Sequence, residues 1–226
     1  MSGLRRLPFS PPGLPPGALA AAHARGGVPA HMPQIVVVGA PLSEVQAAAM
    51  FLLGLSEAFP LPIVLVVRGA ADDYGDINVT LQAHCALPVR QIDDKDPILA
   101  GRVHLAPAGY HVLVERTHFV LSTEPPVDDV RPSIDVLLES VGDVFGAGVV
   151  CVLLGADGRA QRVSDGHAGA ARVRARGGLV IVQNPATAAV GAADDPAVPA
   201  TVPAGTMLHL SEIGPFVSRL GDVELA

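Results

Sequence analysis

The sequence predicts an α/β fold in which a doubly wound, mainly parallel sheet carries an appended antiparallel hairpin. From Gln34 onward, short apolar strands alternate with segments of helical apolar spacing, which is the pattern of strand–helix–strand units. Several strands are unbroken runs rich in β-branched residues, as is typical of strands buried on both faces. Two further strands are separated only by Arg116 and Thr117, which indicates a hairpin.

The first expected strand is residues 35–38, an unbroken run of isoleucine and valine, and residues 63–67 form the second. Residues 89–92 and 102–105 are shorter strands on either side of an acidic turn at 93–96. The remaining expected strands are the two of the hairpin and two later buried runs, at residues 111–115, 118–121, 148–154 and 179–182.

Helical apolar spacing predicts five helices, at residues 41–58, 77–85, 133–145, 168–176 and 211–220. Pro41 suits a first helical turn, where no backbone N–H is needed. Ser133 and Ser211 are suitable N-caps for the third and fifth helices, because a serine hydroxyl accepts a hydrogen bond from the first turn. Residues 188–203 have the composition of a loop.

Residues 1–33 differ from the rest and predict a flexible arm ahead of a single domain over residues 34–226. The arm contains no acidic residue, and its prolines stand at positions 8, 11, 12, 15, 16, 29 and 33. Proline at this density prevents helix and central strand, and it interrupts the apolar run that a secretion signal needs. The arm is also shorter than a further folded domain of about 100 residues.

Composition excludes several classes of function. A net charge of −7 argues against nucleic-acid binding, which needs a basic surface. No apolar run approaches the roughly 18 residues of a membrane span. Cys85 and Cys151 lie far apart without metal-ligand spacing, so we expect a reducing, cytoplasmic compartment and neither a metal nor another cofactor.

Five ordered blocks of sequence resemble the catalytic domain of the chemotaxis protein-glutamate methylesterases, the CheB family. They occur in the family's order and spacing and span roughly residues 34–220. The blocks are residues 86–90, 101–114, 131–137, 155–158 and 177–188. The resemblance implies a doubly wound α/β fold and removal of methyl esters from receptor glutamates. The family's N-terminal receiver domain has no counterpart here, so phosphorylation control through such a domain is not expected.

The resemblance also implies a Ser/His/Asp triad, in which an imidazole activates a hydroxyl and a carboxylate orients the imidazole. Pro41 stands at the position of the family's serine, and Gly69 stands at the position of its histidine. Asp157, in the turn that begins at Gly155, matches the family's aspartate. We therefore expect a catalytically silent module that binds a protein partner, such as a chemoreceptor or another chemosensory component.

Positions after the missing serine are changed as well. Where the family has a small residue and two glycines, this chain has Leu42, Ser43 and Glu44. A carboxylate near a developing oxyanion opposes catalysis. Tyr110 and Gly155 are expected to contribute to binding of a protein segment beside the altered positions.

The alternative hypothesis is an active methylesterase or serine hydrolase that uses displaced groups. Ser43 would be the nucleophile, His111 its base and Asp157 the orienting carboxylate. The plainer interpretation is that Ser43 is a first-turn hydroxyl and that His111 is a hydrogen-bonded strand residue.

Three other groups of residues are explained without a functional site. His104, His111 and His118 recur every seven residues but fall on different strands, so chance is favoured over a metal site. Solvated loops explain the carboxylates at residues 72–73 and 93–94 better than a divalent cation does. The arginines of the fourth helix predict a basic face, with a docking site for an acidic helix as the alternative; they are Arg172, Arg174 and Arg176, with Arg162 nearby.

Overall fold

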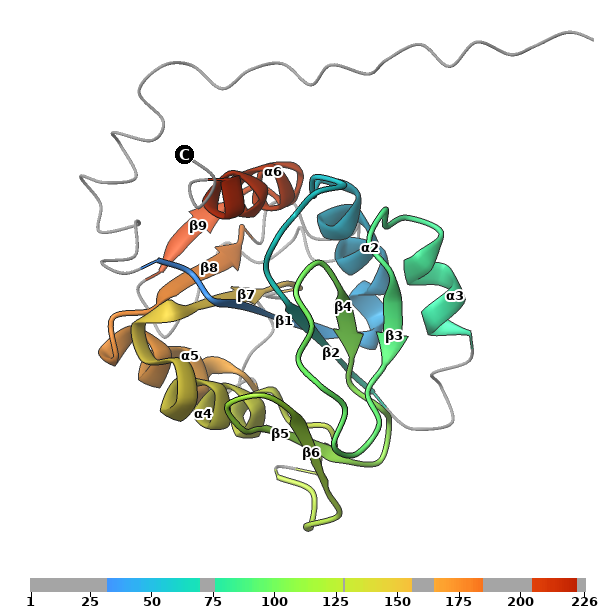
Figure 1. Cartoon of the computed structure of the whole chain (residues 1–226), viewed down its shortest axis with the longest axis vertical. Coiled ribbons are helices and arrows are strands. Elements are labelled where there is room, and N and C mark those ends of the chain that lie inside the picture. The colour runs from blue at the N-terminus through green and yellow to red at the C-terminus, as the bar shows by residue number, and fades with distance from the viewer. Residues whose placement is uncertain (1–31, 70–75, 128, 156–164, 185–204, 223–226) are drawn as a thin grey trace, which may run out of the picture.

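The computed structural model describes residues 32–69, 76–127, 129–155, 165–184 and 205–222. In these residues a seven-stranded sheet runs in the order β3-β4-β2-β1-β7-β8-β9, and every neighbouring pair is parallel (Figure 1). Strands β5 and β6 form a separate antiparallel pair. The predicted fold class, including the hairpin, is therefore confirmed.

The strands match the predicted ones closely, with one addition. Strand β9 was not predicted, because it is only three residues long and half exposed at the edge of the sheet. The bounds of the parallel strands are β1 Ile35–Pro41, β2 Ile63–Arg68, β3 Val89–Gln91, β4 Val103–Leu105, β7 Val149–Leu153, β8 Leu179–Gln183 and β9 Thr206–Leu208. The hairpin consists of β5 His111–Val114 and β6 Phe119–Ser122.

All five predicted helices are present, although their ends differ. Ser211, predicted as the N-cap of the last helix, is instead its second residue. They are α2 Val45–Leu53, α3 Ile77–Gln82, α4 Ile134–Phe145, α5 His167–Ala175 and α6 Leu210–Asp222. Two 3-10 turns, η1 Leu42–Glu44 and η3 Gly146–Gly148, precede α2 and follow α4. The predicted loop at residues 188–203 and the predicted arm, apart from its last two residues, lie outside the described residues.

The first predicted helix begins later than expected, which corrects the role given to Pro41. Pro41 is the last residue of β1, with extended φ and ψ of −71° and 153°. It pairs with Arg68 of β2, whereas the pairing of β1 with β7 stops at Gly39. A proline therefore fits at this strand end, because β1 no longer has a partner on both sides there.

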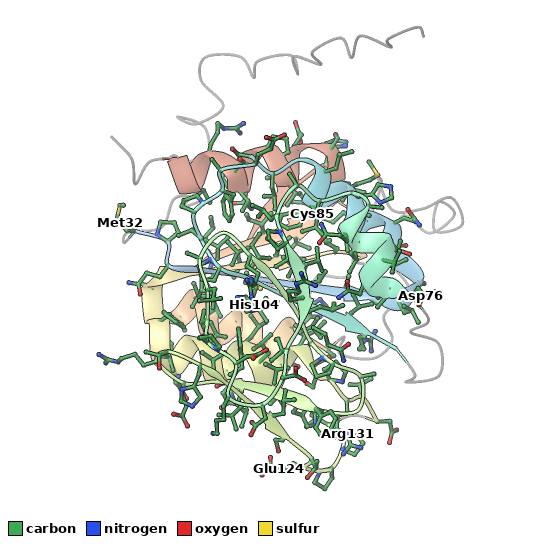
Figure 2. All side chains as sticks on the ribbon, turned by 45° about the vertical axis from the view of Figure 1, so that its right-hand side comes forward. Met32, Asp76, Cys85, His104, Glu124 and Arg131 are labelled. Carbon is green, nitrogen blue, oxygen red and sulfur yellow. The ribbon has the colours of Figure 1, made fainter. Side chains whose placement is uncertain are left out.

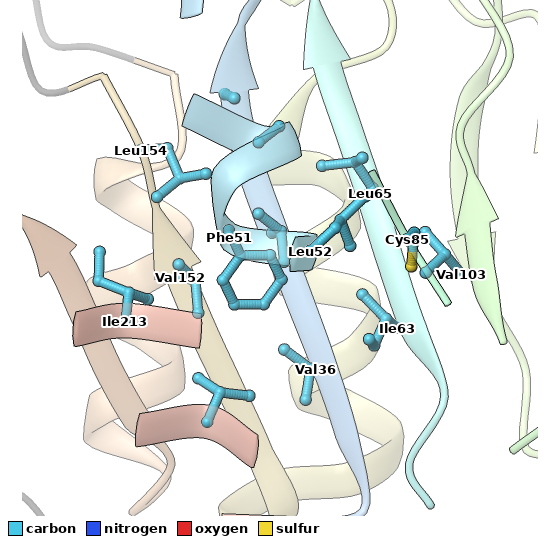
Figure 3. Packing of buried hydrophobic residues seen from close by; sticks show 14 of the residues in the cluster. Val36, Phe51, Leu52, Ile63, Leu65, Cys85, Val103, Val152, Leu154 and Ile213 are labelled. Atoms are coloured by element: carbon cyan, nitrogen blue, oxygen red, sulfur yellow. The ribbon is translucent and has the colours of Figure 1, made fainter. Parts of the chain in front are cut away.

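Alternate residues of the central strands enter two separate cores. Val36 and Val38 pack with α2, α3 and α6, and Figure 3 shows Phe51 and Ile213 among the residues of this core. Val37, from the same strand, packs with α4, α5 and the hairpin on the opposite face. This arrangement explains the near-continuous apolar runs, since neither face of the sheet is open to water.

The direction of winding reverses beside β1. The chain leaves β1 for β2 on one side and later returns to β7 on the other. In an open α/β sheet, such a reversal is where the carboxyl ends of strands carry functional groups. A functional site is therefore expected at the carboxyl ends of β1, β2 and β7.

Neighbouring segments form hydrogen bonds with part of each outer edge of the hairpin. Beside β6, the backbone of Lys95 and Asp96 exchanges hydrogen bonds with Phe119, and the Asp94 carboxylate accepts one from the Leu121 N–H at 3.0 Å. Beside β5, the Ser140 hydroxyl of α4 accepts a hydrogen bond from the backbone N–H of Val114 and donates one to its carbonyl. The acidic turn predicted at residues 93–96 thus has a structural role.

Helices α2 and α6 approach each other through two glycines. A Cβ atom at Gly214 would lie 2.5 Å from the carbonyl oxygen of Phe51 and 2.9 Å from the Cα of Gly54. Backbone atoms cannot move aside as the tip of a side chain can, so this crossing requires glycine.

We expect Gly214→Ala to lower the free energy of unfolding by about 1–3 kcal/mol, because the added methyl group overpacks the crossing. Gly142→Ala in α4 is the matched control, because its Cβ meets chiefly the flexible end of Arg176, at 3.3 Å. The control is expected to leave stability unchanged or raise it by up to about 1 kcal/mol, owing to the helix propensity of alanine. Urea denaturation followed by circular dichroism measures both, and equal effects would contradict the tight crossing.

Candidate functional site

Pro41 and Gly155, at the ends of β1 and β7, lie next to each other. A Cβ atom at Gly155 would be 2.9 Å from Pro41 Cδ and 2.6 Å from Glu44 Cγ. Gly155 also has a φ of +66°, which favours glycine. The turn after β7 is therefore packed directly against the junction of β1 and η1.

Gly69 follows the end of β2 and packs against Leu42 of η1. Segment 41–44 thus contacts the residues that follow both neighbouring strands, so Pro41, Gly69 and Gly155 meet at one edge of the sheet. Asp157, which the sequence singled out, lies outside the described residues.

Gln183 fixes the turn after β7. Its side chain is fully buried at the end of β8, and its Oε1 accepts a hydrogen bond from the Gly155 N–H at 2.9 Å. Gln183 is not among the site residues predicted from the sequence. A usable signal was present, since a glutamine that ends an apolar strand run must find a polar partner when it is buried.

Ser43 and His111 are not joined by a hydrogen bond in the described part of the chain. Ser43 is exposed on η1. His111 is buried, its Nδ1 accepts a hydrogen bond from the Ser133 N–H at 3.3 Å, and its Nε2 lies 3.2 Å from the Pro125 carbonyl oxygen. This arrangement makes Nε2 the protonated nitrogen, which donates to Pro125.

Tyr110 lies on the loop between β4 and β5, and 41% of its surface is exposed. The preceding Gly109 N–H donates to the Arg131 carbonyl oxygen, at 3.4 Å, just ahead of α4. The Arg131 side chain in turn donates to the carbonyl oxygens of Thr123 and Glu124, at 3.1 Å each, at the hairpin end of the molecule (Figure 2). The loop therefore presents Tyr110 outward from a hydrogen-bonded support.

Asp165 is a further buried polar residue, and it is not among those predicted from the sequence. Its buried carboxylate accepts hydrogen bonds from the Ser133 hydroxyl at 2.8 Å, the Ile134 N–H at 2.7 Å and the Asp135 N–H at 3.0 Å. These donors form the N-terminus of α4, where a negative charge is favoured by the helix dipole. The signal available was a second Asp-Gly pair, Asp165-Gly166, after the one at Asp157.

Asp165 lies close to the sheet edge described above. The side chain of Ile134, whose N–H binds Asp165, would lie 2.7 Å from a Cβ atom on Gly39 of β1. It also contacts Gly166, beside Leu153 of β7. The start of α4 thus connects Asp165 to β1, which ends at Pro41, and to β7, which ends two residues before Gly155.

Ser133, His111 and Asp165 form a buried cluster, but it is not a catalytic relay. The Ser133 hydroxyl donates to the Asp165 carboxylate and accepts from the Val136 N–H at 3.4 Å. The imidazole of His111 binds the Ser133 backbone instead of its hydroxyl. The predicted N-cap role of Ser133 is confirmed by this geometry.

Asp135 completes the junction of α4 and α5. Its Oδ1 accepts a hydrogen bond from the Gly169 N–H in the first turn of α5, at 2.6 Å. The first turn of α4 therefore binds the carboxylate of Asp165, which precedes α5, and the first turn of α5 binds the carboxylate of Asp135, which lies in α4. Burial raises the pKa of Asp135 above its ordinary value, and the charge of Asp165 acts in the same direction.

The three histidines at seven-residue spacing have separate partners. His104 Nε2 lies 3.1 Å from the Leu99 carbonyl oxygen, and burial lowers its pKa. His118 lies 3.3 Å from the carboxylate of Glu115. Across the described residues, no group of three or more histidine, cysteine, aspartate or glutamate side chains is placed to hold a metal ion.

The basic face predicted for α5 is partly neutralised. Arg172 forms an ion pair with Glu139, and Arg176 forms one with Asp143, both across to α4. Two of the arginines therefore have acidic partners within this chain, and their presence does not require docking of an acidic helix.

The family model for CheB methylesterase matches residues 36–217. A Leptospira interrogans protein named as a protein-glutamate methylesterase/protein-glutamine glutaminase is 32% identical over 194 residues, covering 85% of this chain and 97% of that protein. A protein of the same name from Anaeromyxobacter dehalogenans is 36% identical over 157 residues, covering 70% of this chain and 45% of that protein. The chain thus spans nearly all of the first relative and about half of the second.

The catalytic domain of the Thermotoga maritima CheB methylesterase has a similar fold. Its crystal structure superposes with a TM-score of 0.72 at 23% identity, covering 83% of this chain and 98% of that domain. In the part of the chain that the structure describes, no helix has the length and apolar character needed to cross a membrane.

We expect Asp165→Ala to lower the free energy of unfolding by about 2–4 kcal/mol, because three donors at the start of α4 lose a charged acceptor. Asp143→Ala is the matched control, since its exposed ion pair contributes less than about 1 kcal/mol. Chemical denaturation of the two variants beside the parent chain gives both values. Equal losses would show that the Asp165 carboxylate does not hold the helix junction.

Proposed function

The chain belongs to the CheB methylesterase family, and from this premise we propose that it is a methylesterase-like module that binds a signalling protein without cleaving an ester. The expected partner is a protein segment that carries glutamate side chains, of the kind that chemoreceptors present to this family. The observation that carries the proposal is the meeting of Pro41 and Gly69 at the edge where the winding of the sheet reverses.

The two residues supply none of the chemistry that an ester hydrolase needs. Pro41 has no hydroxyl to attack a carbonyl carbon, and Gly69 has no side chain to accept the proton. Loss of one triad member lowers turnover by about four to six powers of ten, and loss of a second adds little further. Turnover by the family mechanism is therefore expected to be negligible.

The surroundings of Gly155 also oppose an oxyanion. Glu44, an acidic residue, packs against Gly155 through its Cβ and Cγ atoms. The Gly155 N–H already donates to Gln183 Oε1. A negative charge that develops at this edge would have acidic Glu44 nearby, and the Gly155 N–H would already be donating to Gln183. A preorganised oxyanion hole needs the opposite, free N–H donors and no carboxylate.

The alternative hydrolase would have to activate Ser43. His111, its proposed base, is buried with its ring nitrogens at Ser133 and Pro125. These contacts support the plainer interpretation of His111 as a structural residue, and they favour the non-catalytic module.

Incubation with methylated receptor fragments is expected to release no methanol above the buffer background, as followed by gas chromatography. The Thermotoga maritima catalytic domain is the positive control on the same fragments. Ammonia release from receptor glutamines is measured in parallel, because the relatives are also named as glutaminases.

Methanol or ammonia release that disappears in Ser43→Ala would contradict the proposal and establish the hydrolase. Release that Ser43→Ala leaves unchanged would also contradict it, and would direct the search to another nucleophile.

Binding is expected to use Tyr110. Tyr110→Ala should weaken binding to an immobilised receptor fragment about tenfold, because exposed tyrosines are frequent binding hot spots. Met50→Ala is the control, since Met50 is also an exposed apolar side chain but lies on α2, on the other side of the sheet. Surface plasmon resonance measures both affinities, and an equal effect of the two substitutions would place the binding surface elsewhere.

A further inference from the structure

The side chain of Leu42 lies where any side chain at position 69 would begin. A Cβ atom built on Gly69 would be 2.9 Å from both Cβ and Cδ2 of Leu42, and 3.4 Å from its Cγ. Cβ atoms in proteins essentially never approach another heavy atom closer than 3.0 Å. Glycine is therefore the only residue that fits at position 69 while Leu42 stays in place.

Leu42 cannot simply rotate out of the way. Its Cδ2 can move with a change of rotamer, but its Cβ moves only with the backbone of η1. That backbone follows Pro41, which is paired with Arg68 of β2. The Leu42 side chain also packs against the core on the α2 face of the sheet.

The neighbouring strand end is filled by the same segment. A Cβ atom at Gly155 would be 2.6 Å from Glu44 Cγ and 2.9 Å from Pro41 Cδ. Residues 41–44 are thus packed against glycines on both sides of β1.

We propose that Leu42 is the residue that closes the position where an esterase of this family holds its imidazole. The glycine at 69 and the leucine at 42 are then one coupled change, and residue 42 decides whether the histidine position can be occupied. This inference rests on the proposed function, because it assigns the histidine position to residue 69. Replacing Pro41 and Gly69 by serine and histidine would place the histidine Cβ against Leu42 unless Leu42 is also replaced.

The test is the cost of Gly69→Ala in three backgrounds: the parent chain, Leu42→Ala and Leu42→Gly. Leu42→Ala removes Cγ and Cδ2 but keeps the Cβ contact, whereas Leu42→Gly removes all of them. In the parent chain Gly69→Ala should lower Tm by about 3–8 °C, as expected for an overpacked site in a chain of this size. The loss should be smaller in Leu42→Ala and under about 2 °C in Leu42→Gly.

Gly142→Ala is the control, because α4 lies on the other face of the sheet and its effect should be the same in all three backgrounds. A Gly69→Ala chain that folds only when Leu42 is replaced supports the proposal. An equal loss in every background, including failure to fold in every one, overturns it. If Leu42→Gly itself does not fold, the comparison of the parent chain with Leu42→Ala still decides.

The melting experiment tests the role of Leu42 and the methanol assay tests the proposed function, so either can be contradicted without the other. Uncoupled Tm shifts with no methanol release would reject the role of Leu42 and leave the binding module intact. Coupled shifts together with methanol release would show that the leucine fills position 69 although the chain is an active hydrolase.

Discussion

The buried carboxylate of Asp165 anchors the start of α4, the helix whose Ile134 packs against Gly39 near the end of β1. It binds the first N–H groups of α4 and the Ser133 hydroxyl, while Asp135 of α4 binds the first turn of α5. The same start of α4 accepts His111 of the hairpin as a partner. Hydrogen bonds to a buried charge are stronger than those between neutral groups. If one partner is removed, the buried group left without a hydrogen bond lowers the stability of the fold. Asp165 thus holds the start of α4, Asp135 joins α4 to α5, and the Ser133 N–H joins the same helix start to the hairpin.

The fold does not depend on the groups that a hydrolase would use. Both cores are built from apolar side chains on alternate faces of the strands, whereas Pro41, Gly69 and Gly155 lie at the partly exposed edge. Replacing a serine or a histidine there removes little buried apolar surface. Under the proposed function, this separation would explain how the chain keeps the architecture of an esterase family with different residues at its strand ends.

The sheet and hairpin could be predicted because they depend on local pattern. Runs such as residues 63–67 are apolar throughout, and Ser133 stands directly before a helical pattern. The strand end at Pro41 was predicted wrongly, since its conformation follows from pairing with Arg68 and that pairing is not visible in the local sequence. Strand β9 was missed because it is short and at an edge. Asp165 was missed because its partners are about 30 residues away, so only the tertiary structure brings them together.

The hydrogen bonds along both sides of the hairpin limit how another molecule can dock there. Free strand edges allow a partner peptide to extend a sheet through its main chain. Here Asp94 and the backbone of Lys95 and Asp96 already occupy one side, and Ser140 occupies the other beside Val114. At Val114 and Phe119 the outward main-chain groups are therefore already paired, so a molecule that docks there would be contacted through side chains such as the exposed Tyr110.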